Sequence, residues 1–286
     1  MGYRSNMPAI ACVNGQFSPI ETAVISVEDR GFQLGDGVYE VLRTYRGRPF
    51  AMEEHLRRLF RSLEAIEIEH RFTPAELERL IRDGIQRGGF AESLVYLQIT
   101  RGPAKRAKEF PPGVSPTLVL TVRELEAPSA ALRAGGARLM TAKDIRWQRC
   151  DIKSVCLLAN VLTFHRAKAA GFNEAVFVEE DEAVAECCSA NLFIVQHGQV
   201  ATPPKTARIL GGITREAVIA LARKQRVPLE ERRVQLAELR AADEVFLTGT
   251  TVEILPVVQV DGQAIGAGKP GPVTEKLQEL FQNSVA

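Results

Sequence analysis

The segment EDRGFQLGDGVYE, at residues 28–40, is where the fold of this chain can be argued most directly. Two glycines flank Asp36, but the third glycine of a dinucleotide-binding turn is absent, which excludes that kind of nucleotide loop. The apolar and aromatic residues from Val38 to Tyr45 predict a β-strand, with Gly47 in the turn that follows it.

The sequence around this strand predicts a mixed first half. Asn14-Gly15 breaks the apolar runs of residues 10–27, which suits a β-hairpin. Two amphipathic helices and two further strands are predicted at residues 52–66, 73–87, 94–100 and 117–123. A basic loop, residues 101–112, separates the last two strands. The first half is therefore expected to be an α+β unit.

A linker is predicted between Glu124 and Gly136, where Ala, Pro, Ser and Gly accumulate. We therefore expect two domains, residues 1–130 and residues 131–286. The second domain is predicted to mix strands with helices, the strands at residues 137–141, 175–178, 192–195 and 244–248 and the helices at 155–170 and 214–225. Asp261-Gly262 predicts a closing hairpin turn.

Composition excludes several classes of protein. Of the 286 residues, 45% are hydrophobic and 25% charged, which is ordinary for a globular protein. The net charge of +1 gives no field that would recruit nucleic acid or an anionic membrane. No apolar run approaches the roughly 18 residues of a membrane helix. Met1 to Val13 shows no leader, so we expect a cytoplasmic protein.

The cysteines and histidines favour neither disulfides nor a metal site. The five cysteines are odd in number and include the neighbours Cys187 and Cys188, so we expect reduced thiols. The four histidines are scattered, and none lies near a cysteine pair. Because the ligand spacings of structural zinc sites are missing, we expect no bound metal.

Lys153 is the first candidate for chemistry. Ile152 and Val155 lie close to it in the sequence, and partial desolvation would disfavour its ammonium form. A neutral lysine amine attacks carbonyl groups, which a solvated ammonium does poorly. An arbitrary lysine is most often a solvated surface charge, so this pattern alone leaves both interpretations open.

Glu186 is a lone acid among small, mostly apolar neighbours. Such a carboxylate is costly to bury without a cationic partner. A protonated pyridine nitrogen would be one such partner, because it holds a cofactor ring as an electron sink. The alternative is a buried ion pair with an arginine.

An anion site is predicted at Gly211-Gly212, where a helix begins. The free N–H groups and the positive end of the helix dipole could hold a phosphate there. The alternative is an ordinary helix capped by Thr214. Thr250 offers a hydroxyl at the end of a strand, and Arg58 offers a cation, although its charged neighbours also suit a solvated helix face.

Five segments together resemble the fold-type IV pyridoxal-phosphate enzymes, and within them the D-amino acid transaminases, the D-specific branch of the family. The segments occur in the order of that family, at residues 28–40, 144–147, 149–154, 212–215 and 250–254. The resemblance implies a small N-terminal α/β domain and a larger C-terminal pseudo-barrel domain. It also implies that pyridoxal 5′-phosphate lies in the cleft between them.

The resemblance implies a role for each matching residue. Lys153 would be the Schiff-base lysine that moves the proton, and Glu186 would pair with the pyridine nitrogen. Tyr39 matches a tyrosine on the substrate side. The phosphate would be held by four residues, two of them through backbone N–H groups, namely Arg58, Ile213, Thr214 and Thr250.

In that family a loop of the partner subunit traps the substrate carboxylate, which implies a homodimer. The matching loop, residues 101–111, keeps the arginine at Arg106. Lys108 replaces the histidine of the family, and its ammonium is a point charge on a flexible stem instead of a planar ring. Cys187 and Cys188 also depart from the family, which usually shows glycine and serine there.

The implied reaction is a ping-pong transfer of the amino group of a D-amino acid to a 2-oxo acid by a pyridoxal-phosphate-dependent aminotransferase. Three alternatives share the scaffold: a branched-chain L-amino acid transaminase, an aminodeoxychorismate lyase and a pyridoxal-phosphate-binding protein without catalysis. Residues 35–40 and the Arg106 loop resemble the D-specific branch, which disfavours the L-specific one.

Overall fold

The computed structural model describes residues 9–286, which form two compact units. Unit 1 comprises the described residues up to Glu126 together with Ile152–Cys156, and unit 2 comprises Ala127–Asp151 and Leu157–Ala286. The sequence placed the segment around Lys153 in the second domain, whereas it belongs to unit 1. Residues 1–8, part of the start that was expected to lack a leader, lie outside the described residues.

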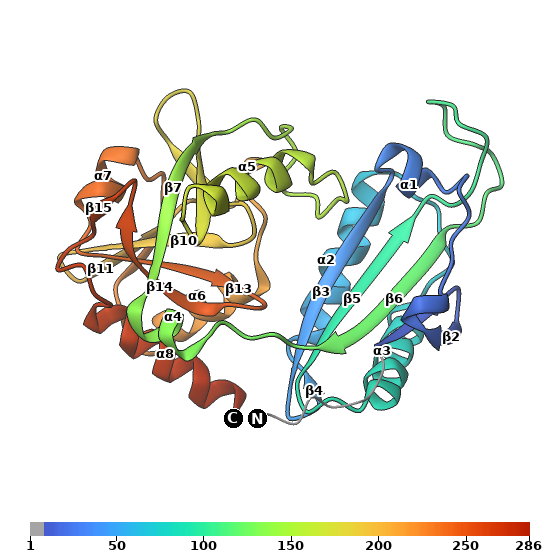
Figure 1. Cartoon of the computed structure of the whole chain (residues 1–286), viewed down its shortest axis with the longest axis horizontal. Coiled ribbons are helices and arrows are strands. Elements are labelled where there is room, and N and C mark those ends of the chain that lie inside the picture. Colours follow the sequence, from blue (N-terminus) through green and yellow to red (C-terminus); the bar gives the residue numbers. More distant parts are fainter. Residues whose placement is uncertain (1–8) are drawn as a thin grey trace. The chain divides into compact units, whose positions relative to one another are not determined.

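Unit 1 is built on an antiparallel sheet with the strand order β2-β1-β6-β5-β3-β4 (Figure 1). The strands are β1 (Ile10–Val13), β2 (Gln16–Pro19), β3 (Gly37–Tyr45), β4 (Arg48–Pro49), β5 (Ser93–Thr100) and β6 (Thr117–Glu124). The helices are a 3₁₀ helix (Ile20–Thr22), α1 (Arg30–Leu34), α2 (Met52–Ala65) and α3 (Pro74–Gly88). The elements predicted in the first half are present within a few residues, whereas α1 was not predicted.

Local sequence explains the helices and the main strand of unit 1. Thr73 and Glu76 form a capping box before α3, and Pro74 fits its first turn because that turn needs no N–H donor. Side chains alternate along β3, so Val38 and Glu40 face the buried core while Tyr39 faces the other side of the sheet. The strand therefore presents an acid to one face and an aromatic ring to the other.

Unit 2 contains a mixed sheet with the strand order β12-β11-β10-β13-β14-β7-β8-β9, and β15 pairs with β14 (Figure 1). The strands are β7 (Ala137–Lys143), β8 (Glu174–Val178), β9 (Val184–Cys187), β10 (Asn191–Gln196), β11 (Gln199–Thr202), β12 (Leu229–Glu231), β13 (Glu244–Gly249), β14 (Glu253–Val260) and β15 (Gln263–Ala264). The helices are α4 (Ala130–Gly135), α5 (Leu158–Ala169), α6 (Ile213–Lys224), α7 (Leu236–Ala241) and α8 (Pro272–Val285). Aliphatic side chains of the sheet form the core of this unit.

Several features of unit 2 differ from the prediction, among them strands β9 and β12 and helix α7, which were not predicted. The helix expected at residues 155–170 begins at Leu158, because the residues before it pair with β3 instead. The expected linker contains α4, which begins where the Ser129 side chain accepts a hydrogen bond from the Leu132 N–H (3.1 Å). The C-terminal helix α8 was not predicted. Among the described residues, no helix has both the length and the apolar character that crossing a membrane requires.

Candidate active site

Backbone hydrogen bonds hold Lys153 against strand β3 of unit 1. The Tyr39 N–H donates to the Lys153 carbonyl (2.9 Å), and the Val155 N–H donates to the Gly37 carbonyl (3.0 Å). The Lys153 N–H donates to Ser62 Oγ on α2 (3.3 Å). The backbone position of this lysine is therefore fixed by the sheet and a helix rather than by a flexible loop.

The Lys153 side chain lies over the ring of Tyr39. Nζ is 4.2 Å from the ring centroid, and the side chain is half-buried. The Tyr39 ring in turn stacks on Tyr96 of β5, with ring centroids 5.5 Å apart. The face of an aromatic ring attracts a cation, so this contact is favourable for the ammonium form of the lysine. The structure thus brings together two of the predicted site residues.

A buried cluster lies on the opposite face of β3. Glu40, which is fully buried, accepts hydrogen bonds from Arg58 Nε (2.7 Å) and Nη2 (2.8 Å) and from His55 Nδ1 (2.7 Å). Burial by itself would raise the pKa of Glu40, but the ion pair with Arg58 and the bond with His55 lower it to about 2. The suggestion that Arg58 belongs to a solvated helix face is therefore wrong.

This cluster predicts a dependence of stability on pH. Because folding lowers the pKa of Glu40 from 4.5 to about 2, its contribution is complete above pH 4.5 and is lost as pH falls towards 2. We expect the stability difference between wild type and Glu40→Gln to shrink by roughly 2 kcal/mol between pH 6 and pH 3. Urea unfolding of wild type and Glu40→Gln at pH 6 and at pH 3 measures this difference in the free energy of unfolding.

The matched control is Glu53→Gln on α2, the helix that carries Arg58, where Glu53 and its partner Arg57 are both exposed. Exposed pairs contribute little, so this variant should differ from wild type by a similar small amount at both pH values. A Glu40→Gln difference that stays constant from pH 6 to pH 3 would contradict the ion-pair account of Glu40.

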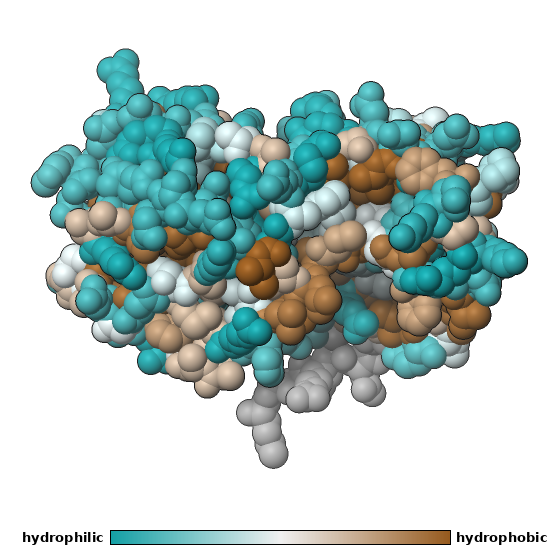
Figure 2. All heavy atoms as spheres, turned by 90° about the horizontal axis from the view of Figure 1, so that it is seen from above, coloured by the Kyte–Doolittle hydropathy of each residue, from teal (hydrophilic) through white to brown (hydrophobic). Residues whose placement is uncertain are grey.

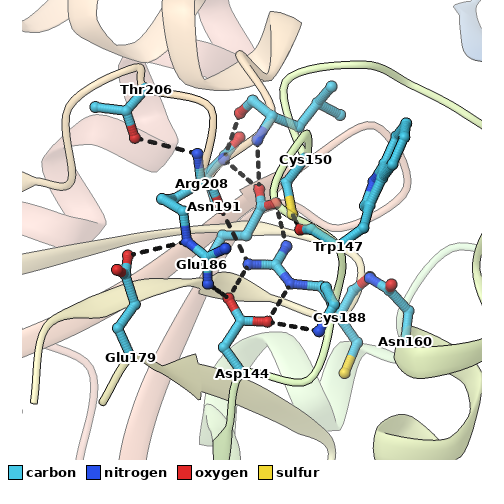
Figure 3. Close-up of polar contacts among 12 residues, drawn as sticks. Asp144, Trp147, Cys150, Asn160, Glu179, Glu186, Cys188, Asn191, Thr206 and Arg208 are labelled. Carbon is cyan, nitrogen blue, oxygen red and sulfur yellow. Dashed lines mark hydrogen bonds and ion pairs between the residues drawn. The ribbon is translucent and has the colours of Figure 1, made fainter. Parts of the chain in front are cut away.

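In unit 2, Glu186 is buried on β9 and accepts three hydrogen bonds (Figure 3). The donors are Arg146 Nη1 (2.6 Å) to Oε1, and Asn191 Nδ2 (3.1 Å) and the Leu210 N–H (3.0 Å) to Oε2. The buried ion pair with an arginine, given above as the alternative partner of Glu186, is therefore present. All three donors are N–H groups, and the one from Arg146 is a charge-assisted hydrogen bond.

Arg146 is itself held by a second acid, Asp144, which is labelled in Figure 3. Its Nε and Nη2 donate to the two oxygens of Asp144 (3.0 and 2.9 Å), and its guanidinium lies 4.3 Å from the centroid of the Phe177 ring. Arg208 Nη2 also donates to Asp144 (2.9 Å). Glu186 is therefore not neutralised by an isolated cation, because Arg146 shares its charge with Asp144.

Helix α6 begins at Gly212, and no side chain among the described residues caps it. The N–H groups of Ile213 and Thr214 thus lie in the first turn, at the positive end of the helix. Thr214 is buried inside that turn, so its suggested role as the cap is wrong. A Cβ atom on Gly212 would lie 2.0 Å from Asn191 Oδ1, so only glycine fits this approach.

Asn191 connects these parts of unit 2. Its Nδ2 donates to Glu186 and also to the Leu210 carbonyl (2.8 Å), just before α6. On β10 it pairs with Thr248, two residues before the half-buried Thr250 in the turn after β13. One amide side chain therefore joins the predicted ring partner to the start of the predicted phosphate-binding helix.

The structure thus groups the predicted site residues in two sets. One set, Lys153, Tyr39 and Arg58, belongs to unit 1, and the other, Glu186, Ile213, Thr214 and Thr250, belongs to unit 2. Arg106 and Lys108 are exposed on the loop between β5 and β6 of unit 1.

Four residues that no sequence pattern singled out hold members of these sets in place. Glu40 binds Arg58 and His55, and Glu186 is bound by Arg146 and Asn191. His55 and Arg58 are three residues apart on the apolar face of α2. Two polar side chains on such a face indicate a buried acidic partner, which here is Glu40.

Comparisons with known proteins identify a family. Residues 37–260 match the protein family described as Amino-transferase class IV. The D-alanine aminotransferase of Bacillus licheniformis is 39% identical over 272 residues, which cover 95% of each chain. That of Listeria monocytogenes is 38% identical over 275 residues, covering 96% of this chain and 95% of the relative.

Solved structures of the same fold are also similar. The branched-chain amino acid aminotransferase of Escherichia coli superposes with a TM-score of 0.91 at 28% identity, covering 97% of this chain and 94% of that one. A branched-chain amino acid aminotransferase from T.th., solved with pyridoxamine 5′-phosphate, gives a TM-score of 0.90 at 30% identity, covering 98% and 94%. These similarities confirm the predicted fold-type IV architecture.

Proposed function

Because the chain belongs to the class IV aminotransferase family, we propose that it transfers the amino group of a D-amino acid to a 2-oxo acid. It is a pyridoxal-phosphate-dependent transaminase. The observation that carries the choice of a D-amino acid is the set of D-alanine aminotransferases that are 35–39% identical over almost the whole chain. The similar branched-chain structures are 26–30% identical, which makes the L-specific reaction the alternative to test.

The described residues fit pyridoxal 5′-phosphate. An amine on a fixed backbone is present at Lys153, and a buried acid paired with an arginine at Glu186. The start of α6, which no described side chain caps, offers backbone N–H groups to a phosphate. At Gly212 the neighbouring Asn191 leaves no room for a side chain. We propose that Lys153, Glu186, Ile213 and Thr214 hold the cofactor, with Arg58 and Thr250 on its phosphate.

We propose distinct tasks for these side chains. The bound cofactor supplies an aldehyde that condenses with amines, together with a ring that takes up the electron pair released at the α-carbon. Lys153 would hold the cofactor through Nζ. Once the substrate amine has displaced it, the free Nζ would accept the α-proton of the substrate and return it on the cofactor side. Glu186 would pair with the ring nitrogen, and Arg146 would hold Glu186 in place. Tyr39 forms an aromatic wall beside the amine.

We propose that Arg106 and Lys108 bind the substrate carboxylate. Arg106→Ala removes a charge-assisted hydrogen bond, so KM for D-alanine and for 2-oxoglutarate should each rise about tenfold or more. Initial rates of amino transfer between the two substrates measure this. The neighbouring exposed Lys105 provides the matched control, and Lys105→Ala should leave both KM values within about twofold of wild type. Unchanged KM values in Arg106→Ala would refute this role of the loop.

We also propose that the enzyme is a homodimer. Hydrophobic side chains reach the surface of the face shown in Figure 2. On α5, Leu158 is 71% exposed, Val161 59% and Leu162 42%, at the i, i+3, i+4 spacing of one helix face. Exposed apolar patches of this kind mark protein–protein contacts, and a second copy of the chain would cover this one.

A complementation experiment tests whether the trap acts on the partner subunit. Arg106→Ala and Lys153→Ala subunits should each be poorly active alone. In a hybrid dimer, the site with an intact Lys153 receives the intact loop of the other subunit. Coexpression should therefore restore about a quarter of wild-type activity if subunits pair at random. Activity no higher than that of the separate variants would mean that the loop serves its own subunit.

The cysteines suit a reducing compartment. All five are free thiols, and Cys187 is buried. Burial raises the pKa of the Cys187 and Cys188 thiols, so both stay protonated near neutral pH. Reduced thiols are typical of the cytoplasm, which we propose as the location of the enzyme.

A further inference from the structure

One partly buried carboxylate in unit 1, that of Asp36, holds two buried arginines. Asp36 Oδ2 accepts hydrogen bonds from Arg30 Nε and from Arg101 Nε, both at 2.8 Å, and Oδ1 accepts from Arg101 Nη2 (3.1 Å). Arg30 is 3% exposed and Arg101 is 7% exposed. The proposed tasks above use none of these three residues.

Both arginines also reach the loop that carries Arg106 and Lys108. Arg30 Nη1 donates to the carbonyl of Ala107 (2.8 Å), the residue between the two exposed cations. The Arg101 guanidinium lies 3.6 Å from the centroid of the Phe110 ring, two residues after Lys108. The loop is thus fixed at its centre and on the far side of Lys108.

The base of the loop leaves little room for adjustment. The Arg30 N–H donates to the Gly102 carbonyl (3.0 Å), and the Ala104 N–H donates to the Glu28 carbonyl (3.0 Å). Gly102 has φ +100°, and a Cβ atom there would lie 2.0 Å from the Ser115 carbonyl oxygen. Because the base is already fixed by the backbone, the contact between Arg30 and Ala107 orders the exposed tip.

We infer that Arg30 is a positioning residue for the substrate carboxylate, acting through the Ala107 carbonyl on Arg106 and Lys108. This inference rests on the proposed function, in which these cations bind that carboxylate. Long cationic side chains on an exposed tip lose much conformational freedom on binding a ligand, and a fixed backbone between them reduces that loss. A small displacement of a binding group is enough to weaken binding strongly.

The test is a pair of substitutions at Arg30 in the cofactor-loaded enzyme. In Arg30→Met, Asp36 keeps both hydrogen bonds from Arg101, so the partly buried carboxylate stays paired. Arg30→Lys keeps a positive charge next to Asp36. One ammonium, however, cannot donate to both the Asp36 carboxylate and the Ala107 carbonyl with the geometry of a guanidinium. Both variants should raise KM for D-alanine and for 2-oxoglutarate about tenfold, with kcat within about threefold of wild type. If Arg30→Met does not fold, the KM values of Arg30→Lys test the inference by themselves.

The matched control is Arg43→Met at a different buried arginine, on β3, which pairs with Glu92 (3.2 Å) and lies over the Tyr45 ring. Its KM values should stay within about twofold of wild type. A second comparison places Arg30→Met in an Arg106→Ala/Lys108→Ala background, where it should raise KM less than about twofold further, because the groups that it positions are gone.

The outcomes separate the inference from the proposed function. If Arg106→Ala raises KM but the Arg30 variants do not, the positioning role is overturned and the carboxylate trap stands. If Arg30→Met raises KM by the same factor with and without the loop cations, Arg30 acts on the fold alone and the inference is overturned. If Arg106→Ala itself leaves KM unchanged, the trap and the inference fail together.

Discussion

Lys153→Ala is expected to abolish turnover, with kcat reduced roughly 10⁴-fold or more, as for the loss of a central catalytic group in other enzymes. Alanine has no amine to bind the cofactor or to move the proton, and the Tyr39 ring next to this position offers no comparable base. The fold should survive, because Lys153 is held by its backbone N–H and carbonyl, which alanine keeps. Steady-state transfer from D-alanine to 2-oxoglutarate gives the measurement.

Lys143→Ala is the matched control for this variant. Lys143 is a lysine of β7 whose side chain is 69% exposed and pairs with Glu180, which is also exposed. Its removal should change kcat by less than about twofold, because exposed pairs contribute little. Near-normal activity of Lys153→Ala would end the assignment of Lys153 as the catalytic amine.

The second large effect is expected at Glu186. Glu186→Gln keeps the size of the side chain but removes the negative charge beside the ring nitrogen, so kcat should fall about 100-fold or more. Arg146 stays paired with both oxygens of Asp144, which limits the cost of the buried cation. The cofactor should still bind through Lys153, so the visible absorbance of the holoenzyme should persist while turnover drops.

Two further variants make the Glu186 result interpretable. Glu186→Ala also leaves Asn191 Nδ2 and the Leu210 N–H without this acceptor, so it should lose stability as well as activity. Glu180→Ala, at an exposed acid of the same unit, should leave kcat within about twofold of wild type. Wild-type kcat in Glu186→Gln would remove the electronic role of this acid.

Periodicity and turn residues predicted most of the elements in both units. The strand beginning near Val38 and the two helices after it are present, because apolar spacing and caps act locally. The start of α5 was placed too early, since nothing in the local sequence indicates that residues 152–156 pair with β3. The C-terminal helix α8 was missed, although Leu277 and Phe281 have the i, i+4 spacing of an apolar helix face. Both side chains are buried in the structure.

The predicted site residues came from matching motifs, whereas their partners depended on contacts between distant segments. Arg58 looked solvated from its own helix, and only the strand that carries Glu40 makes its burial favourable. Glu186 had two possible partners in the sequence, and the fold supplies the arginine through the segment around Arg146. Such pairings join residues far apart in the chain, which local patterns do not specify.

The most direct test of the central claim is the visible absorbance of the purified, cofactor-loaded enzyme before and after D-alanine or L-alanine is added without an acceptor. Without an acceptor, only the first half of the transfer can occur, so the absorbance reports amino-group uptake and its stereochemistry together. We predict that D-alanine bleaches the cofactor band and that L-alanine leaves it unchanged. Bleaching by L-alanine alone, or by neither isomer, would contradict the proposal that this chain is a D-amino acid transaminase.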